Sequence, residues 1–173
     1  DFISNQIGAL DATQIKGITS TQIAALTTTD IAEFNSTQIS ALTTTQLAAF
    51  STTQIAALDS TQSAGLSTTQ LAALTTTQIR GLGAVDFGEL NSTQLSALSI
   101  VQISNLSTTA IADLTSTTFG MFTTTQISAL TTTQIDNLAA GNISALAATQ
   151  LAAFTSAQVQ SFDDLQTAAY LGV

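Results

Sequence analysis

Residues 123–135 read TTTQISALTTTQI, a complete eight-residue unit followed by the first five residues of the next. The same unit runs from Ile3 to Tyr170 without insertion or deletion, giving 21 octads that fill 168 of the 173 residues. We number the places of each octad from one to eight, so that Thr123 is at the first place and Leu130 at the eighth. One inserted residue would shift every later apolar side chain, so this strict frame indicates a repeat protein in which each octad is one structural step.

Each place of the octad has its own residue type. The eighth place is Leu, Ile, Phe or Tyr in all 21 octads, and the fifth is Ile, Leu, Val or Phe in 19, Ser63 and Thr167 being the exceptions. Gln holds the fourth place in 16 octads, and Ser, Thr, Asp or Asn the first place in 17. The sixth and seventh places are mostly Ala, Ser or Gly. Two large apolar residues per octad therefore supply a core, and small residues separate them.

The start of each octad matches a helix N-terminus. A Ser or Thr N-cap followed three residues later by Gln is a capping box, in which each side chain accepts a hydrogen bond from a backbone N–H. The apolar residue before the cap and the one at the fourth helical position form a hydrophobic staple, as with Leu26, Thr27 and Ile31. Both signals recur in each octad, which predicts one very short helix of about six or seven residues per unit.

Other secondary structures fit the octad less well. In a continuous helix, eight residues overshoot two turns by roughly 80°, so the apolar stripe would wind around the rod. A strand through the octad would place its fifth and eighth residues on opposite faces. A parallel β-solenoid remains the main alternative, because Thr and Ile favour strands. The lack of Gly or Asn at a fixed corner place argues against it.

One octad cannot fold alone, since ordering eight residues costs on the order of 12 kcal/mol and burying two large apolar side chains returns roughly 3–6 kcal/mol. Stacked neighbours must supply the remainder. We therefore expect an all-α solenoid of about 21 two-turn helices, with an Ile, Leu and Phe core and with Thr and Gln facing solvent. Residues 1–173 form a single repeat domain (octads 3–170), expected to be a fragment of a longer chain or a filament subunit. The pattern does not give the number of octads per superhelical turn.

The composition excludes many functions. Charged residues make up 8% of the chain, and eleven carboxylates against two cations, Lys16 and Arg80, give a net charge of −9. The absence of His and Cys excludes imidazole bases, thiolate nucleophiles, zinc sites of the usual kind and disulfides. Two cations form no phosphate-binding surface, and polar residues interrupt every apolar run, so we expect neither nucleic-acid binding nor membrane insertion. The sequence thus predicts a protein that is not an enzyme and uses no cofactor.

Two octads carry paired acids that could form a site. Asp30 with Glu33, and Asp86 with Glu89, each place two carboxylates three residues apart on one helical face. Such pairs are weak candidates for calcium binding or acid–base chemistry. The alternative is that the first acid of each pair favours the helix dipole and the second adds solubility. We favour the alternative, because Ca²⁺ requires more oxygen ligands than two separated pairs provide.

The run from Thr123 to Ile135 resembles octapeptide arrays in large secreted or surface proteins of proteobacteria, some of them adhesin-like. This resemblance implies an extracellular or cell-surface structural role, as a stalk, a surface layer or a filament that self-associates end to end or side by side. The leading hypothesis is therefore a non-enzymatic structural repeat protein. The second hypothesis is a binding module, because a solenoid would present its Thr residues in regular rows that could recognise ice or a polysaccharide.

Overall fold

The computed structural model describes residues 6–173 and forms this part of the chain from short helices, with no strand among them. The elements are the 3₁₀ helix η1 (Ile7–Ala9) and the α-helices α1 (Ala12–Gly17), α2 (Ser20–Ala24), α3 (Thr28–Ile31), α4 (Ser36–Ala41), α5 (Thr44–Ala48), α6 (Thr52–Ala56), α7 (Ser60–Gly65), α8 (Thr68–Ala72), α9 (Thr76–Gly81), α10 (Ala84–Gly88), α11 (Ser92–Ser96), α12 (Ile100–Ser104), α13 (Thr108–Asp113), α14 (Ser116–Gly120), α15 (Thr124–Ser128), α16 (Thr132–Asp136), α17 (Ala140–Ser144), α18 (Ala148–Leu151), α19 (Ser156–Gln160) and α20 (Asp164–Leu171). The all-α prediction is confirmed, and the described residues contain no part of a β-solenoid.

The predicted capping box starts most of these helices. At α5, the backbone N–H of Gln46 donates to Thr43 Oγ1 over 3.2 Å, and the backbone N–H of Thr43 donates to Gln46 Oε1 over 2.8 Å. Where the first place is Gly83 or Ala147, no cap side chain exists, and only the second of these two bonds forms. The capping box predicted from the first and fourth places of the octad is therefore present at the starts of these helices.

The helices are shorter than expected. Those from α1 to α19 contain four to six residues, against the predicted six or seven. The residue at the eighth place is already extended in several octads, as Leu42 is with φ −59° and ψ 135°. An extended residue directs the chain away from the helix axis and into the next N-cap, so each helix ends before its second turn is complete.

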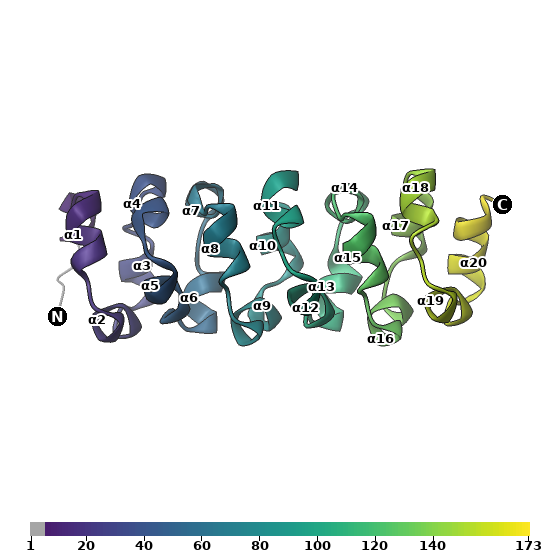
Figure 1. The fold of residues 1–173 in the computed structure, drawn as a ribbon, viewed down its shortest axis with the longest axis horizontal. Helices are drawn as coiled ribbons and strands as arrows, with labels where there is room; N and C mark the ends of the chain where they lie inside the picture. The colour runs from purple at the N-terminus through teal and green to yellow at the C-terminus, as the bar shows by residue number, and fades with distance from the viewer. Residues whose placement is uncertain (1–5) are drawn as a thin grey trace.

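The helices wind into an elongated solenoid with the termini at opposite ends (Figure 1). Each helix packs mainly against the third helix along the chain, as α1 does against α4 and α4 against α7. Helices α1, α4, α7, α11, α14 and α18 follow one another along the upper edge in Figure 1, so successive turns are three or four octads apart. The structure thus gives the number of octads per superhelical turn, which the octad pattern did not give.

The core is one continuous column of apolar side chains along the solenoid axis. It contains almost every fifth-place and eighth-place residue from Ile7 to Phe154. Around the N-cap Thr131, for example, the staple residues Leu130 and Ile135 are both buried. The two members of the predicted hydrophobic staple therefore enter the same core, and each octad adds its pair to the pairs above and below.

The C-terminal end is packed differently. Helix α20 has eight residues and ends at Gly172, whose left-handed φ of 74° suits a residue without Cβ. The rings of Phe154, Phe162 and Tyr170 meet edge to face with centroids 5.2–6.1 Å apart. Phe162 and Tyr170 are partly buried against the core, so this aromatic cluster packs on its last part.

Candidate functional site

The feature that recurs throughout the solenoid is a buried glutamine that joins one turn to the turn before it. In Gln70, Oε1 accepts from the backbone N–H of Ser67 over 2.8 Å, which completes its own capping box. The Nε2 group of the same side chain donates to the carbonyl oxygens of Ile39 and Leu42, both over 2.8 Å. These acceptors lie 31 and 28 residues earlier in the chain. One amide thus satisfies a helix start and ties it to the end of a helix in the preceding turn.

We call this series of bonds the glutamine ladder. Its members donate through Nε2 to carbonyl oxygens 28 to 31 residues earlier, and they are Gln38, Gln46, Gln54, Gln62, Gln70, Gln78, Gln94, Gln102, Gln126, Gln134, Gln150, Gln158 and Gln166. All except Gln150 are buried. The expectation that Gln faces solvent was therefore wrong, because burial is favourable once every polar atom of the amide is paired.

A signal for this ladder was present in the sequence. A capping box accepts Glu as readily as Gln at its third helical position, and the helix dipole favours the acid there. Glu nevertheless occupies the fourth place in none of the 21 octads. A place that takes an amide and avoids the equally long carboxylate needs a hydrogen-bond donor, which the capping box itself does not require.

The ladder is interrupted where the fourth place is not Gln. Asn142 is one methylene shorter, and its Nδ2 donates only to the carbonyl oxygen of Leu114, over 3.0 Å. Thr118 Oγ1 pairs with Thr115 Oγ1 within its own octad. Ala110 has no polar side-chain atom, and Asp86 brings a carboxylate that can donate no hydrogen bond while it is ionised. Among the described residues, the octads of Asp86, Ala110 and Thr118 therefore lack the tie that the Gln octads beside them have.

The structure gives the first acid of the Asp30 and Glu33 pair a capping role. Asp30 Oδ2 accepts from the backbone N–H of Thr27 over 2.8 Å and from Thr27 Oγ1 over 2.7 Å. This is the position that Gln Oε1 takes in other octads, so the preference for a helix-start role is supported for Asp30. Glu33 lies at the seventh place and is half-buried.

The second pair has the same local role and an additional contact. Asp86 Oδ2 accepts from the backbone N–H of Gly83 over 2.6 Å. Glu89 Oε2 accepts from the hydroxyl of Ser63 on α7 over 3.0 Å, across one solenoid turn. Within residues 6–173, no three acidic, His or Cys side chains come close enough to hold a metal ion together. A calcium site at either pair stays a prediction without a third side-chain ligand.

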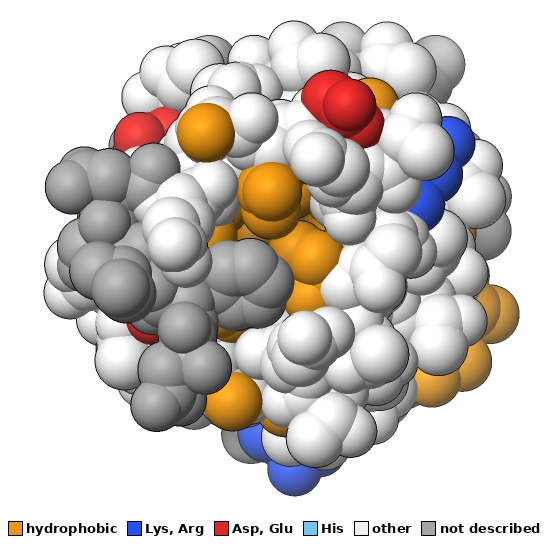
Figure 2. All heavy atoms as spheres, turned by 90° about the vertical axis from the view of Figure 1, so that its left-hand side faces the viewer, with side chains coloured by type: hydrophobic (Ala, Val, Ile, Leu, Met, Phe, Trp, Pro, Cys, Tyr) orange, Lys and Arg blue, Asp and Glu red, His pale blue; other side chains and the backbone are white. Residues whose placement is uncertain are grey.

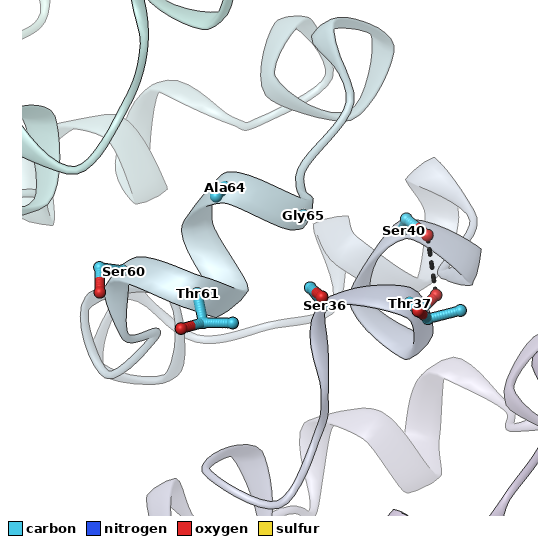
Figure 3. Close-up of a pocket in the computed structure, with 7 residues that line it drawn as sticks. All are labelled: Ser36, Thr37, Ser40, Ser60, Thr61, Ala64 and Gly65. Carbon is cyan, nitrogen blue, oxygen red and sulfur yellow. Dashed lines mark hydrogen bonds between the residues drawn. The ribbon is translucent and has the colours of Figure 1, made fainter.

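A shallow groove runs between α4 and α7 (Figure 3). Ser36, Thr37 and Ser40 line it from α4, and Ser60 and Thr61 from α7. Gly65 forms the close contact between the two helices, because a Cβ added there would lie 2.6 Å from the carbonyl oxygen of Ser36. The groove has hydroxyl groups along its rim, but it is open and contains no charged side chain.

The comparisons with known proteins give a repeat family and no more. A family model described as the ALTTAQ repeat matches residues 25–61, a stretch that runs from the end of one octad through four complete octads and into a fifth. This match supports a repeat array of that kind. No curated protein and no solved structure matches the chain. The function has to be argued from the geometry of the solenoid itself.

Proposed function

We propose that this chain is a structural rod, a segment of a stalk or filament. Its function is mechanical and depends on its length and its stiffness. The observation that supports the proposal is the glutamine ladder, which ties each turn to the one before it from Gln38 to Gln166. Most inter-turn bonds are buried, so bending or stretching the solenoid would expose unpaired carbonyl groups. Because each such group costs about 1–3 kcal/mol, the ladder opposes deformation along the whole axis.

The chemistry of the chain agrees with a non-enzymatic role. It contains no His or Cys, and its two cations are exposed on the solenoid surface. No helix among residues 6–173 combines the length and the apolar character needed to cross a bilayer. The resemblance to octapeptide arrays of proteobacterial surface proteins, with the absence of cysteine, supports an exported, adhesin-like setting as part of this proposal.

End-to-end association is the way in which such a rod would extend. Figure 2 views the N-terminal end and shows apolar side chains near the centre of the face, with uncharged polar side chains, backbone and a few charged side chains around them. Gln22 at this end is exposed, and its counterparts further along donate to carbonyl groups of a preceding turn. By the same register, carbonyl groups of the last turn, which follow the last printed acceptor at Leu138, are the acceptors that the glutamines of a following segment would use. Donors at one end and acceptors at the other favour head-to-tail stacking of solenoid segments.

Sedimentation velocity and small-angle X-ray scattering test the proposal. We expect an elongated particle that forms head-to-tail oligomers as concentration rises. Each solenoid turn should contribute about 8–10 Å to the length of the rod, the usual distance between packed helices. Gln22→Glu places a charge against the acceptor end of a second copy and should weaken association. Thr125→Glu adds the same charge on the side of the rod and should not. A compact particle would contradict the rod, and equal association of both variants would contradict end-to-end stacking.

The exposed Thr residues favour one second candidate. Second-place and third-place Thr residues lie at the solvent side of the helix starts, as Thr124 and Thr125 do. Repetition of this arrangement gives regular hydroxyl rows that could recognise ice or a polysaccharide. Thermal hysteresis or glycan-array binding that is lost on Thr→Lys changes at these places would support the candidate. Binding that is indifferent to those changes, or absent, would remove it.

A further inference from the structure

A small, partly open cavity of about 20 Å³ lies beside Asp86, where the glutamine ladder is interrupted. Asp86 and Ser63 are the polar residues of its wall, and Ile55, Leu58 and further leucines complete it. Ser63 is one of the two residues that replace a large apolar side chain at the fifth place. The cavity thus coincides with two departures from the octad, a shorter fourth-place residue and a smaller fifth-place residue.

The ladder register identifies the groups that face this cavity. A fourth-place Gln donates to the carbonyl oxygens 31 and 28 residues earlier, as Gln78 does to Leu47 and Phe50 over 2.9 and 2.8 Å. For Asp86 the corresponding carbonyls are those of Ile55 and Leu58, and both residues line the cavity. Asp86 uses Oδ2 to accept from the N–H of Gly83. In the ladder register its other oxygen is the counterpart of the amide nitrogen, an acceptor where the other octads have a donor.

Ser63 does not supply the missing donor. Its hydroxyl group donates to Glu89 Oε2 over 3.0 Å, and a hydroxyl group has a single hydrogen to give. No cationic side chain serves either, since Arg80 donates to Asn105 Oδ1 and Lys16 belongs to the first turn. The carbonyl oxygen of Ile55 already accepts from the backbone N–H of Leu58. The remaining acceptors, Asp86 and the carbonyl of Leu58, therefore require a donor that is not part of the polypeptide.

We propose that this cavity binds one structural water molecule, which replaces the glutamine amide in the ladder. The water donates one hydrogen to the inward oxygen of Asp86 and the other to the carbonyl oxygen of Leu58 or Ile55. A cavity of about 20 Å³ exceeds the roughly 10–15 Å³ that a water needs, and two to four polar partners are what buried waters use. The mostly apolar wall offers too few oxygens for Ca²⁺, which takes six to eight.

The test compares the chain with its Asp86→Gln variant, with Asp30→Gln as the matched control. The variant restores the residue of most octads, so it is expected to fold. A high-resolution crystal structure of the unmodified chain should show one density peak within hydrogen-bond distance of Asp86 and of the Leu58 or Ile55 carbonyl. In Asp86→Gln, the amide nitrogen should occupy that point and the peak should be gone. Asp86→Gln should raise Tm by about 2–4 °C, and Asp30→Gln, in the first turn, should leave Tm unchanged.

Each result decides for or against the bound water. Absence of a peak in the unmodified chain would overturn the proposal, as would a lower Tm for Asp86→Gln, which would mean that the ladder register does not continue beneath Asp86. A Tm that rises with added NaCl or CaCl₂ in the unmodified chain but not in Asp86→Gln would identify the occupant as a cation and also overturn it. A peak that the Gln side chain displaces, together with the higher Tm, supports it.

Discussion

The fourth-place glutamine accepts a hydrogen bond with its amide oxygen and donates hydrogen bonds with its amide nitrogen. In Gln134, Oε1 accepts from the N–H of Thr131, while Nε2 donates to the carbonyl oxygens of Ile103 and Leu106. Glu retains the first contact and loses the second, and Asn has the right groups on a side chain one methylene shorter. Asn142 illustrates the shortfall, because it reaches the single acceptor Leu114. Gln is therefore required by its polarity and its length together.

At the residue scale, Gln70→Glu tests the ladder directly. The change keeps the acceptor for the N–H of Ser67 but replaces the donor to Ile39 and Leu42 with a buried negative oxygen. We expect a loss of about 3 kcal/mol or more in the free energy of unfolding, because a buried charge and the Leu42 carbonyl are left unpaired, while the Ile39 carbonyl keeps only the backbone N–H of Leu42. Thermal and urea unfolding of the purified variant measure the loss.

The matched control is Gln22→Glu. Gln22 forms the same capping box with Thr19, but it is exposed and lies in the first turn. We expect the free energy of unfolding of the monomer to change by less than about 0.5 kcal/mol. Equal losses in the two variants would show that the capping box, rather than the inter-turn bond, explains the preference for Gln.

At the element scale, the packing of helix n against helix n+3 depends on small residues at the sixth and seventh places. Ala41 and Ala49 pack at the edge of the core from such places. Helices α7 and α4 approach closely through their backbones, and a Cβ on Gly65 would lie 2.6 Å from the backbone oxygen of Ser36. Backbone is close to backbone here, and neither helix can yield without disturbing its own ladder bonds.

Gly65→Ala should therefore destabilise the chain by about 1–3 kcal/mol, the usual cost of overpacking. Gly88, at the end of α10, has no heavy atom within 4 Å of an added Cβ. Gly88→Ala should leave stability unchanged or raise it by up to about 1 kcal/mol, since Ala is the better helix former. Chemical denaturation of both variants gives the comparison, and a neutral Gly65→Ala would mean that α4 and α7 separate at little cost.

At the scale of the whole molecule, the stability of a solenoid is a sum of contributions from each pair of neighbouring turns. Missing inter-turn hydrogen bonds therefore weaken the rod locally, at the turns that lack them. The fourth-place residues at Ala110 and Thr118 make no inter-turn bond to the ends of α9 and α10, unlike those that follow at Gln126 and Gln134. The hydrogen bond from Arg80 to Asn105, 2.8 Å long and exposed, is the polar contact that joins α9 to α12 in this region. The middle of the rod, around α9 and α10, is therefore held together by fewer inter-turn hydrogen bonds, and we call this region the joint.

Native-state hydrogen exchange should locate this joint. We expect amide protection to be lower in α9, α10, α13 and α14 than in α5, α7 and α8 or in α15 and α16, because opening there breaks fewer buried bonds. Ala110→Gln should raise protection around the end of α9 by restoring donors to its carbonyl groups. Uniform protection along the interior of the rod, or no response to Ala110→Gln, would contradict the position of the joint.

The sequence by itself determined the octad frame, the capped start of each helix, the pair of core residues per octad and the absence of the common catalytic groups. All of these depend on residues within one octad or on composition, and local hydrogen bonds such as Thr43 with Gln46 make them readable. The acids at Asp30 and Asp86 were likewise read correctly as helix-start residues.

Only the tertiary structure decided the number of octads per turn, the burial of the glutamines and the residues that line the cavity with Asp86. The bonds concerned span 28 and 31 residues, as from Gln70 to Leu42 and Ile39. Their register depends on how far each extended eighth-place residue turns the chain and how closely small residues let the helices approach. The octad pattern is the same for any angle between successive helices. The carbonyl that a glutamine amide contacts in the neighbouring turn is therefore determined by packing and cannot be predicted from the repeat alone.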